Sequence, residues 1–337
     1  MHFCVLLIIL LFCENLYSKE INLFTTRHYD SDIKLFNEFT KISGIKVNVI
    51  TGKAKPLEKR ILSEGKECKG DLFFLADAGR LVSSEQKGVF RKIKSSFLDN
   101  TVPKRFRSEH WFGITKRARI IYYNPKFTSH NELKGLNYED LSDIRFKNSI
   151  SIRQSNNVYN QSLIASIIEN NGIKYTQDWL KKFVANFSRE PSGNDRAQIL
   201  SVAAGESKLA IANTYYYALM ISGKKGKEQQ NAAKKVKPFF PNQQNRGTHM
   251  NISGIGVLTH SPNPKLAVEF IEFLLSDKAQ KHIVENTYEY PMIDSVQPSD
   301  PVIKMGTNFK QDEITSVSKF GKWQKEAYKL MKNANWN

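Results

Sequence analysis

Two long apolar segments constrain the fold of this chain more than any other feature of the sequence. Residues 111–125 and 250–258 each fit a single extended strand, and the first is too long for one small sheet. The chain between them carries its own strands and helices. Two such strands predict a hinged protein of two lobes, in which the chain crosses from one lobe to the other and later returns.

The segment before the first crossing alternates strands with helices. Strands are expected at 21–26, 46–50 and 71–75, and helices at 31–42 and 56–64. The helix at 31–42 places apolar residues at helical spacing, namely Ile33, Leu35, Phe36, Phe39 and Ile42. This alternation predicts α/β layers with parallel pairing, and the fully apolar strand 71–75 is expected to be central.

The segment between the two crossings forms a second α/β unit. Strands are expected at 149–153 and 209–212, helices at 160–170, 175–187 and 195–204, and a polar loop at 224–230. After the return, helices are expected at 264–275 and 278–286, with further helices to the C-terminus.

The N-terminus is typical of an exported protein. Residues 3–13 are apolar but too few to cross a membrane, and they fit the hydrophobic region of a signal peptide comprising 1–18, although no Lys or Arg precedes them. Removing 1–18 leaves Cys68 as the one thiol, so no internal disulfide is expected. The periplasm is the expected destination.

The formal net charge of +17 raises the question of nucleic-acid binding. The basic residues are scattered along the chain, lysine dominates, and no nucleic-acid-binding motif is present. We therefore expect no nucleic-acid partner, and attribute the charge mainly to a solvated surface.

Tyrosines follow three of the expected strands, each where a helical pattern begins. Tyr29 follows strand 21–26, Tyr159 follows strand 149–153, and Tyr215 and Tyr216 follow strand 209–212. Ligands of open α/β sheets bind outside the carboxyl ends of the strands. Tyr215 and Tyr216 are expected in the first turn of a helix capped by Thr214, from which both rings can lean toward one point. Tyr217 is assigned to packing.

Four phenol oxygens at one place favour a hard, highly charged cation. Each phenolate costs about 4 kcal/mol at pH 7, so four cost roughly 16 kcal/mol. Divalent calcium or magnesium would hardly offset that cost, whereas a trivalent ion could, and Fe(III) is the abundant candidate. Four phenolates around Fe(III) leave one negative charge. Arg27, Arg117 and Arg119 are available to neutralise it, and Arg119 is the expected partner.

Other interpretations stay open on the residues alone. Tyrosines at strand ends are commonly rim or core residues with a satisfied hydroxyl. A solute-binding protein for a small organic or oxyanionic ligand, without metal, could use the same arginines and phenols as donors. An enzyme is not indicated, because the motifs of zinc proteases, serine hydrolases and nucleotide-binding loops are missing from the sequence.

Several stretches of the chain resemble the ferric-iron-binding periplasmic proteins of ABC importers, and the resemblance covers essentially the whole mature chain. The matching stretches are 26–29, 111–119, 159–162, 186–191, 213–216, 240–243, 246–249 and 289–291.

The resemblance implies a two-lobed, type II periplasmic binding protein fold with mixed sheets and crossover hinge strands. With the crossings in 111–125 and 250–258, lobe 1 is expected to comprise 19–115 plus 253–337, and lobe 2 to comprise 116–252.

The resemblance also implies direct Fe(III) coordination. The family's paired tyrosines fall on Tyr215 and Tyr216, its second-lobe tyrosine on Tyr159, and its first-lobe ligand on His28 or Tyr29. The family arginine that contacts ligated oxygen or a bound anion falls on Arg119, so a synergistic anion is a candidate further ligand. The implied partners are an inner-membrane ABC permease and its ATPase, and the mature chain is expected to be a monomer without a membrane span.

Overall fold

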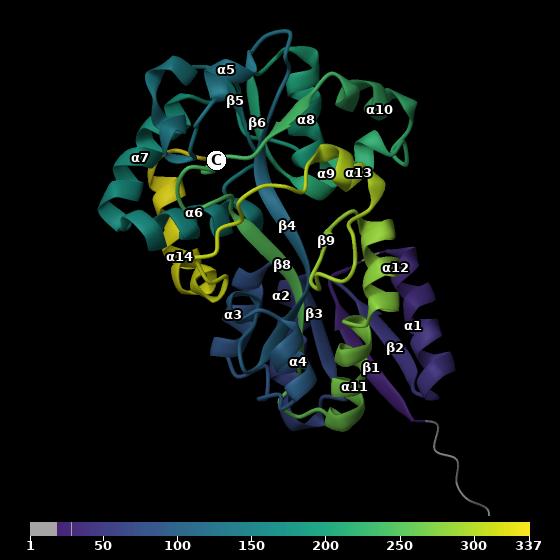
Figure 1. Cartoon of the computed structure of the whole chain (residues 1–337). Helices are drawn as coiled ribbons and strands as arrows, with labels where there is room; N and C mark the ends of the chain where they lie inside the picture. The colour runs from purple at the N-terminus through teal and green to yellow at the C-terminus, as the bar shows by residue number, and fades with distance from the viewer. Residues whose placement is uncertain (1–18, 28) are drawn as a thin grey trace, which may run out of the picture.

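The computed structural model describes residues 19–27 and 29–337. The expected signal peptide, 1–18, and His28 lie outside the described residues. Two groups of helices and strands are joined by the long strands β4 (Trp111–Tyr123) and β8 (Met250–Val257), which run from one group to the other (Figure 1). The expected two-lobed α/β architecture with crossover strands is confirmed.

The two lobes each combine strands with covering helices. The elements of lobe 1 are β1 (Glu20–Thr25), α1 (Asp30–Ser43), β2 (Lys46–Thr51), α2 (Ala54–Glu64), β3 (Leu72–Ala76), α3 (Ala78–Gln86), α4 (Ser96–Thr101), α11 (Pro264–Leu274) and α12 (Asp277–Thr287). The elements of lobe 2 are α5 (His130–Leu133), β5 (Ile150–Ser151), α6 (Val158–Asn171), α7 (Ile173–Ala185), α8 (Asp195–Ala204), β6 (Leu209–Asn213), α9 (Thr214–Ile221), α10 (Lys227–Lys234), β7 (Lys237–Phe239) and α13 (Asp300–Met305).

The strands form one continuous hydrogen-bonded path, in the order β2-β1-β3-β8-β4-β6-β5. The β1–β2, β1–β3 and β5–β6 pairs are parallel, whereas β8 is antiparallel to β3 and β4, and β4 is antiparallel to β6. Both β7 and β9 (Tyr290–Pro291) pair with β4. Parallel pairing therefore holds within the lobes, and the antiparallel pairs lie at the crossing strands. The strand β3 is internal, as expected.

Strand β4 is buried along its whole length and belongs to the sheets of both lobes. All thirteen of its residues are buried, and one end pairs with β8 and the other with β6. A polar side chain at such a position needs a partner inside the protein, and the strand carries two arginines, Arg117 and Arg119.

Local features differ from expectation in three places. Leu35, Phe36 and Phe39 of α1 are buried, but Ile33 and Ile42 are exposed, since the buried stripe of this helix is narrower than its apolar pattern. The expected polar loop at 224–230 is partly helical, because α10 begins at Lys227. The residue before α9 is Asn213, so Thr214 is its first helical residue and not its cap.

The C-terminal segment contacts both lobes. Helix α14 (Ser318–Asn333) packs against α3 and α6. Beyond it, the Trp336 ring lies 5.6 Å from that of Phe183 and 5.2 Å from that of Phe187, between ring centroids, inside lobe 2. The last residues of the chain therefore pack on lobe 2, whereas α14 contacts both lobes. The expected division, with 253–337 in lobe 1, stays a prediction.

Candidate metal centre

The four candidate tyrosines each lie at the start of a helix. Tyr29 directly precedes α1, Tyr159 is the second residue of α6, and Tyr215 and Tyr216 are the second and third residues of α9. The side chain of Asn157 caps α6 by accepting a hydrogen bond from the Tyr159 N–H at 3.1 Å. Helix N-termini carry partial positive charge, which favours an anionic oxygen nearby.

The structure brings these four tyrosines into one cavity of about 300 Å³. The Tyr215 Oη donates to the Tyr159 Oη at 3.2 Å, and the rings of Tyr215 and Tyr216 stack with centroids 4.3 Å apart. Tyr29 enters the same cavity from lobe 1. Phenols from both lobes therefore line one space, which we call the tyrosine cavity.

Arg27 also lines the tyrosine cavity and is held rigidly there. Its Nε donates to Asp32 Oδ2 at 2.8 Å, its Nη2 donates to Asp32 Oδ1 at 3.0 Å, and its Nη1 donates to Glu289 Oε2 at 3.4 Å. The guanidinium lies 4.9 Å from the centroid of the Tyr29 ring. A fixed positive charge therefore lies beside the lobe 1 phenol.

Arg119 is placed differently from expectation. Its Nη1 pairs with Asp195 Oδ2 and donates to Asn213 Oδ1, both at 3.1 Å, and its Nη2 donates to Asn160 Oδ1 at 2.6 Å. It is 1% exposed and is not among the residues that line the tyrosine cavity. These contacts tie β4 to α8, β6 and α6, which is a structural role.

Arg117 is the arginine of β4 that lies at the tyrosine cavity. It lines the tyrosine cavity, its Nη1 donates to Ser253 Oγ at 2.9 Å, and the same atom lies 3.5 Å from Glu289 Oε1. The guanidinium is 5.5 Å from the centroid of the Tyr159 ring. Its buried Nε and Nη2 have no hydrogen-bond partner among the described residues. They are donors available to an anionic oxygen.

Sequence reasoning missed other charged residues of this cavity. Glu289 is 3% exposed and accepts from Thr115 Oγ1 at 2.8 Å, so it is a buried carboxylate beside two arginines. Arg196 lines the cavity with its guanidinium 5.9 Å from the Tyr216 ring, and Lys225 also lines it. Glu289 lies in one of the stretches that carried the family resemblance, which is the signal that could have identified it.

In the absence of a cation, the surroundings of Tyr29, Tyr215 and Tyr216 favour their protonated forms. Burial, followed by the Glu289 carboxylate, raises the pKa of Tyr29, and burial raises that of Tyr215 well above its usual value. Burial and the neighbouring Tyr159 raise the pKa of Tyr216 to about 12. Phenolates can form here only with a strong positive charge among the oxygens.

The donor set fits a hard cation of high charge. Within residues 19–27 and 29–337, no group of three or more His, Cys, Asp or Glu side chains could hold a metal ion. Four phenol oxygens supply up to four negative charges, and Arg27 and Arg117 can offset an excess. A trivalent ion overcomes the cost of removing the phenol protons better than a divalent one.

Comparison with known proteins gives consistent similarities. The family model for bacterial extracellular solute-binding proteins matches residues 34–311. The chain is 45% identical over 320 residues to iron uptake protein A1 of Synechocystis, covering 94% of this chain and 88% of the relative.

Solved structures match over the same extent. A Trichodesmium FutA structure, in complex with iron and citrate, has a TM-score of 0.90 and 46% identity and covers 94% of this chain and 100% of that chain. The ferric binding protein from Campylobacter jejuni has a TM-score of 0.87 and 38% identity, with 94% and 100% covered. Of the helices in the described part of the chain, none has the length and apolar character needed to cross a membrane.

Proposed function

Because this chain belongs to the bacterial extracellular solute-binding protein family, we propose that it captures ferric iron through tyrosine phenolates and delivers it to an ABC permease. The observation that carries this proposal is the convergence of Tyr29, Tyr159, Tyr215 and Tyr216 on one cavity. The relatives named above as iron uptake and ferric binding proteins support the choice of Fe(III).

Capture begins with loss of the phenol protons. The Tyr159–Tyr215 hydrogen bond holds two phenol oxygens 3.2 Å apart before any cation arrives. A ferric ion at this point lowers the pKa of each phenol that it contacts, and the protons leave to solvent. Arg117 and Arg27 then offset the one negative charge that four phenolates around Fe(III) leave. His28 stays a candidate for a further ligand, as does a synergistic anion.

Lobe closure completes capture. Tyr29 comes from lobe 1 and the other three tyrosines from lobe 2, so an ion bound by all four favours the closed form. We place the boundaries between the lobes within β4 and β8, near residues 115 and 253. Helix α13 then lies on lobe 2, where it contacts α9, and α14 contacts both lobes.

The closed, iron-loaded form is the species that docks on the permease and its ATPase. Export by the signal peptide places the protein in the periplasm, where it acts as a monomer, without nucleic acid and without catalysis. Acid or reduction favours release, because protons compete for the phenolates and Fe(II) binds them less strongly.

Ferric titration of the purified mature protein tests the proposal. Ferric citrate should produce a visible phenolate-to-iron charge-transfer band, which Tyr215→Phe and Tyr216→Phe should weaken. Tyr217→Phe is the matched control, because the Tyr217 Oη already donates to the Val236 carbonyl oxygen at 3.1 Å. No band with the wild-type protein would favour the alternative, a binding protein for a small organic or oxyanionic solute.

A further inference from the structure

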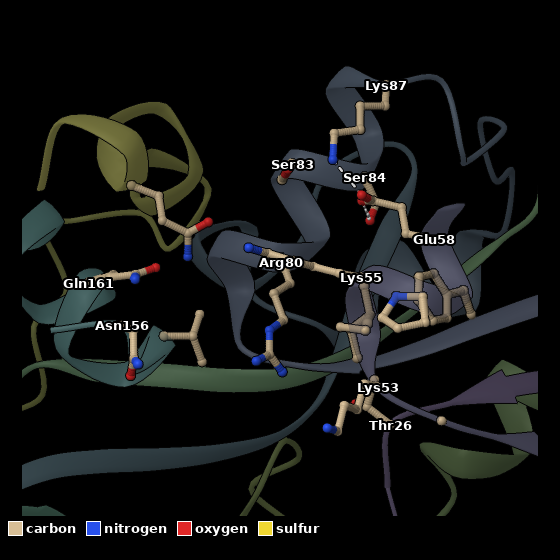
Figure 2. A pocket seen from close by; sticks show the side chains of 17 residues that line it. Thr26, Lys53, Lys55, Glu58, Arg80, Ser83, Ser84, Lys87, Asn156 and Gln161 are labelled. Atoms are coloured by element: carbon tan, nitrogen blue, oxygen red, sulfur yellow. Dashed lines mark hydrogen bonds and ion pairs between the residues drawn. The ribbon is translucent and has the colours of Figure 1, made fainter. Parts of the chain in front are cut away.

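A second cavity, of about 540 Å³, is lined by residues of both lobes. In Figure 2, Lys53, Lys55 and Arg80 belong to lobe 1, and Asn156 and Gln161 lie just before and within the start of α6. We call it the basic cavity. Its volume lies in the range of small-molecule binding sites, which is about 300–1,000 Å³.

The charges of the basic cavity are not balanced. Lys87 and Glu58 form an ion pair, and Ser84 Oγ also donates to Glu58 at 2.6 Å. Within the described residues, Lys53, Lys55 and Arg80 form no ion pair with a carboxylate. Glu58 is the one carboxylate among the described residues that line the cavity, and it already pairs with Lys87. Arg80 Nη1 donates to the Ala76 carbonyl oxygen at 3.4 Å, and the Asp77 carboxylate lies near enough to interact with its charge, so Lys53 and Lys55 contribute most of the excess positive charge.

The start of α2 adds to this positive potential. Residues 52–56 line the cavity, and α2 begins at Ala54 with no acidic residue in its first turn. The residue before it, Lys53, makes no side-chain cap. The first N–H groups of a helix lack intrahelical partners and favour an anion. Pro56 has no N–H, so Ala54 and Lys55 supply the free N–H groups of this first turn, and both residues line the cavity with Lys53 and Arg80.

The basic cavity adjoins the tyrosine cavity without being part of it. Thr26 lines both, and consecutive residues of α6 divide between them, because Val158 lines the basic cavity and Tyr159 the tyrosine cavity. None of the four candidate phenols lines the basic cavity. A ligand there would contact both lobes through its own set of residues.

We propose that the basic cavity binds a small, multiply charged oxyanion, with Lys53, Lys55 and Arg80 as its charged donors and Asn156 and Gln161 as neutral donors from lobe 2. The shared chemistry is two or more clustered anionic oxygens, which a phosphate or a polycarboxylate can supply. This site goes beyond iron capture and needs no iron.

Calorimetric titration of the iron-free mature protein tests this proposal at an ionic strength of about 0.15 M, where charges more than about 8 Å apart are largely screened. Pyrophosphate and citrate are titrated separately, so that the two arms distinguish a phosphate from a carboxylate ligand. The double variant Lys53→Ala/Arg80→Ala should bind the preferred anion about a hundredfold more weakly, because each substitution removes a charge-assisted hydrogen bond that strengthens binding by about tenfold.

Two controls make the result specific. Lys94→Ala/Lys265→Ala removes the same charge from a separate cavity of lobe 1 and should bind like the wild type. Arg117→Gln tests whether the anion enters the tyrosine cavity instead. The proposal is overturned if the wild type binds neither anion, if both double variants weaken binding equally, or if only Arg117→Gln weakens it.

The ferric charge-transfer band of the Lys53→Ala/Arg80→Ala variant separates this proposal from the proposed function. An unchanged band shows that the variant is folded and that iron capture stands, whatever the anion titration gives. Loss of anion binding with the band retained supports the separate site. Loss of the band would show that the two cavities are not independent and would overturn the proposal as stated.

Discussion

At the scale of single residues, neighbouring tyrosines serve different purposes according to what already satisfies their hydroxyls. Tyr217 donates to a backbone carbonyl and its ring stacks on Tyr122, with centroids 5.2 Å apart. Tyr215 instead donates to another phenol, that of Tyr159. A cation can replace the proton of a phenol–phenol hydrogen bond in a cavity more readily than that of a buried hydroxyl bonded to a backbone carbonyl. We therefore expect the segment Tyr-Tyr-Tyr to divide, with Tyr215 and Tyr216 as iron ligands and Tyr217 as a core residue.

Iron binding should release protons, because the pKa values of Tyr29, Tyr215 and Tyr216 are raised above their usual value. These phenols carry protons at pH 7 in the iron-free protein and lose them on binding. Affinity should thus fall by about tenfold per pH unit for each proton released, as the pH falls. Proton counting in weakly buffered solution checks this: about three or more per ferric ion are expected, and fewer for Tyr215→Phe. Affinity independent of pH between about 6 and 8, at equal ferric speciation, would contradict it.

The two arginines of β4 should respond differently to the same substitution. Arg119→Gln leaves buried Asp195 with a weakened partner, so the free energy of unfolding should fall by about 3 kcal/mol or more. Arg117→Gln should chiefly weaken ferric affinity, by about tenfold, because Arg117 lines the tyrosine cavity and its Nε and Nη2 have no partner among the described residues. Chemical denaturation and ferric titration of both variants check this. The reverse pattern would restore Arg119 as the arginine of the site.

At the scale of helices and strands, most of the fold could be predicted because hydrophobic periodicity reports it. The expected helix 195–204 matches α8, and the two long strands match β4 and β8. Periodicity gave no signal for α10, in which Ala233 is the one buried residue. It also does not fix how much of an apolar stripe is covered: Ile33 and Ile42 share the helical spacing of Leu35, Phe36 and Phe39, yet they are exposed.

The candidate site was predictable only in part, because local sequence patterns do not show which distant residues come into contact. Tyrosines after strands could be found because the carboxyl ends of strands meet at one edge. Arg117 and Arg119 could not be told apart, since both lie in the same buried strand and only tertiary contacts assign their partners. Glu289 approaches from a distant segment, and no local pattern marks it as a neighbour of Arg27 and Arg117.

The crossing strands depend on close backbone contact at Gly254. A Cβ added there would lie 2.8 Å from the Phe112 carbonyl oxygen of β4, which cannot move aside as a flexible side chain can. Gly254→Ala should therefore lower the free energy of unfolding by about 1–3 kcal/mol, the usual cost of overpacking. Denaturant titration measures the change. Unaltered stability would show that β4 and β8 separate easily at this point.

At the scale of the whole molecule, part of the net charge of +17 lies in the two cavities. Guanidinium groups surround the phenols in the tyrosine cavity, and lysines with Arg80 line the basic cavity. Both cavities take residues from lobe 1 and lobe 2. Positive charge therefore lies where the lobes meet, beside the phenols proposed to hold Fe(III) and in the cavity proposed to hold an oxyanion.

If iron bridges the lobes, it should stabilise them together and not lobe 2 alone. At about a thousandfold excess of free ligand over the dissociation constant, binding adds about 4 kcal/mol to the stability of the bound form. Hydrogen exchange of backbone amides shows which segments gain this added stability. Wild-type protein should gain protection both at the start of α1 and at the start of α9, whereas Tyr29→Phe at saturating iron should gain it only at α9, because Tyr159, Tyr215 and Tyr216 still hold the ion. Protection confined to lobe 2 in the wild type would mean that Tyr29 does not bind iron, and capture by closure would then have no link between the lobes.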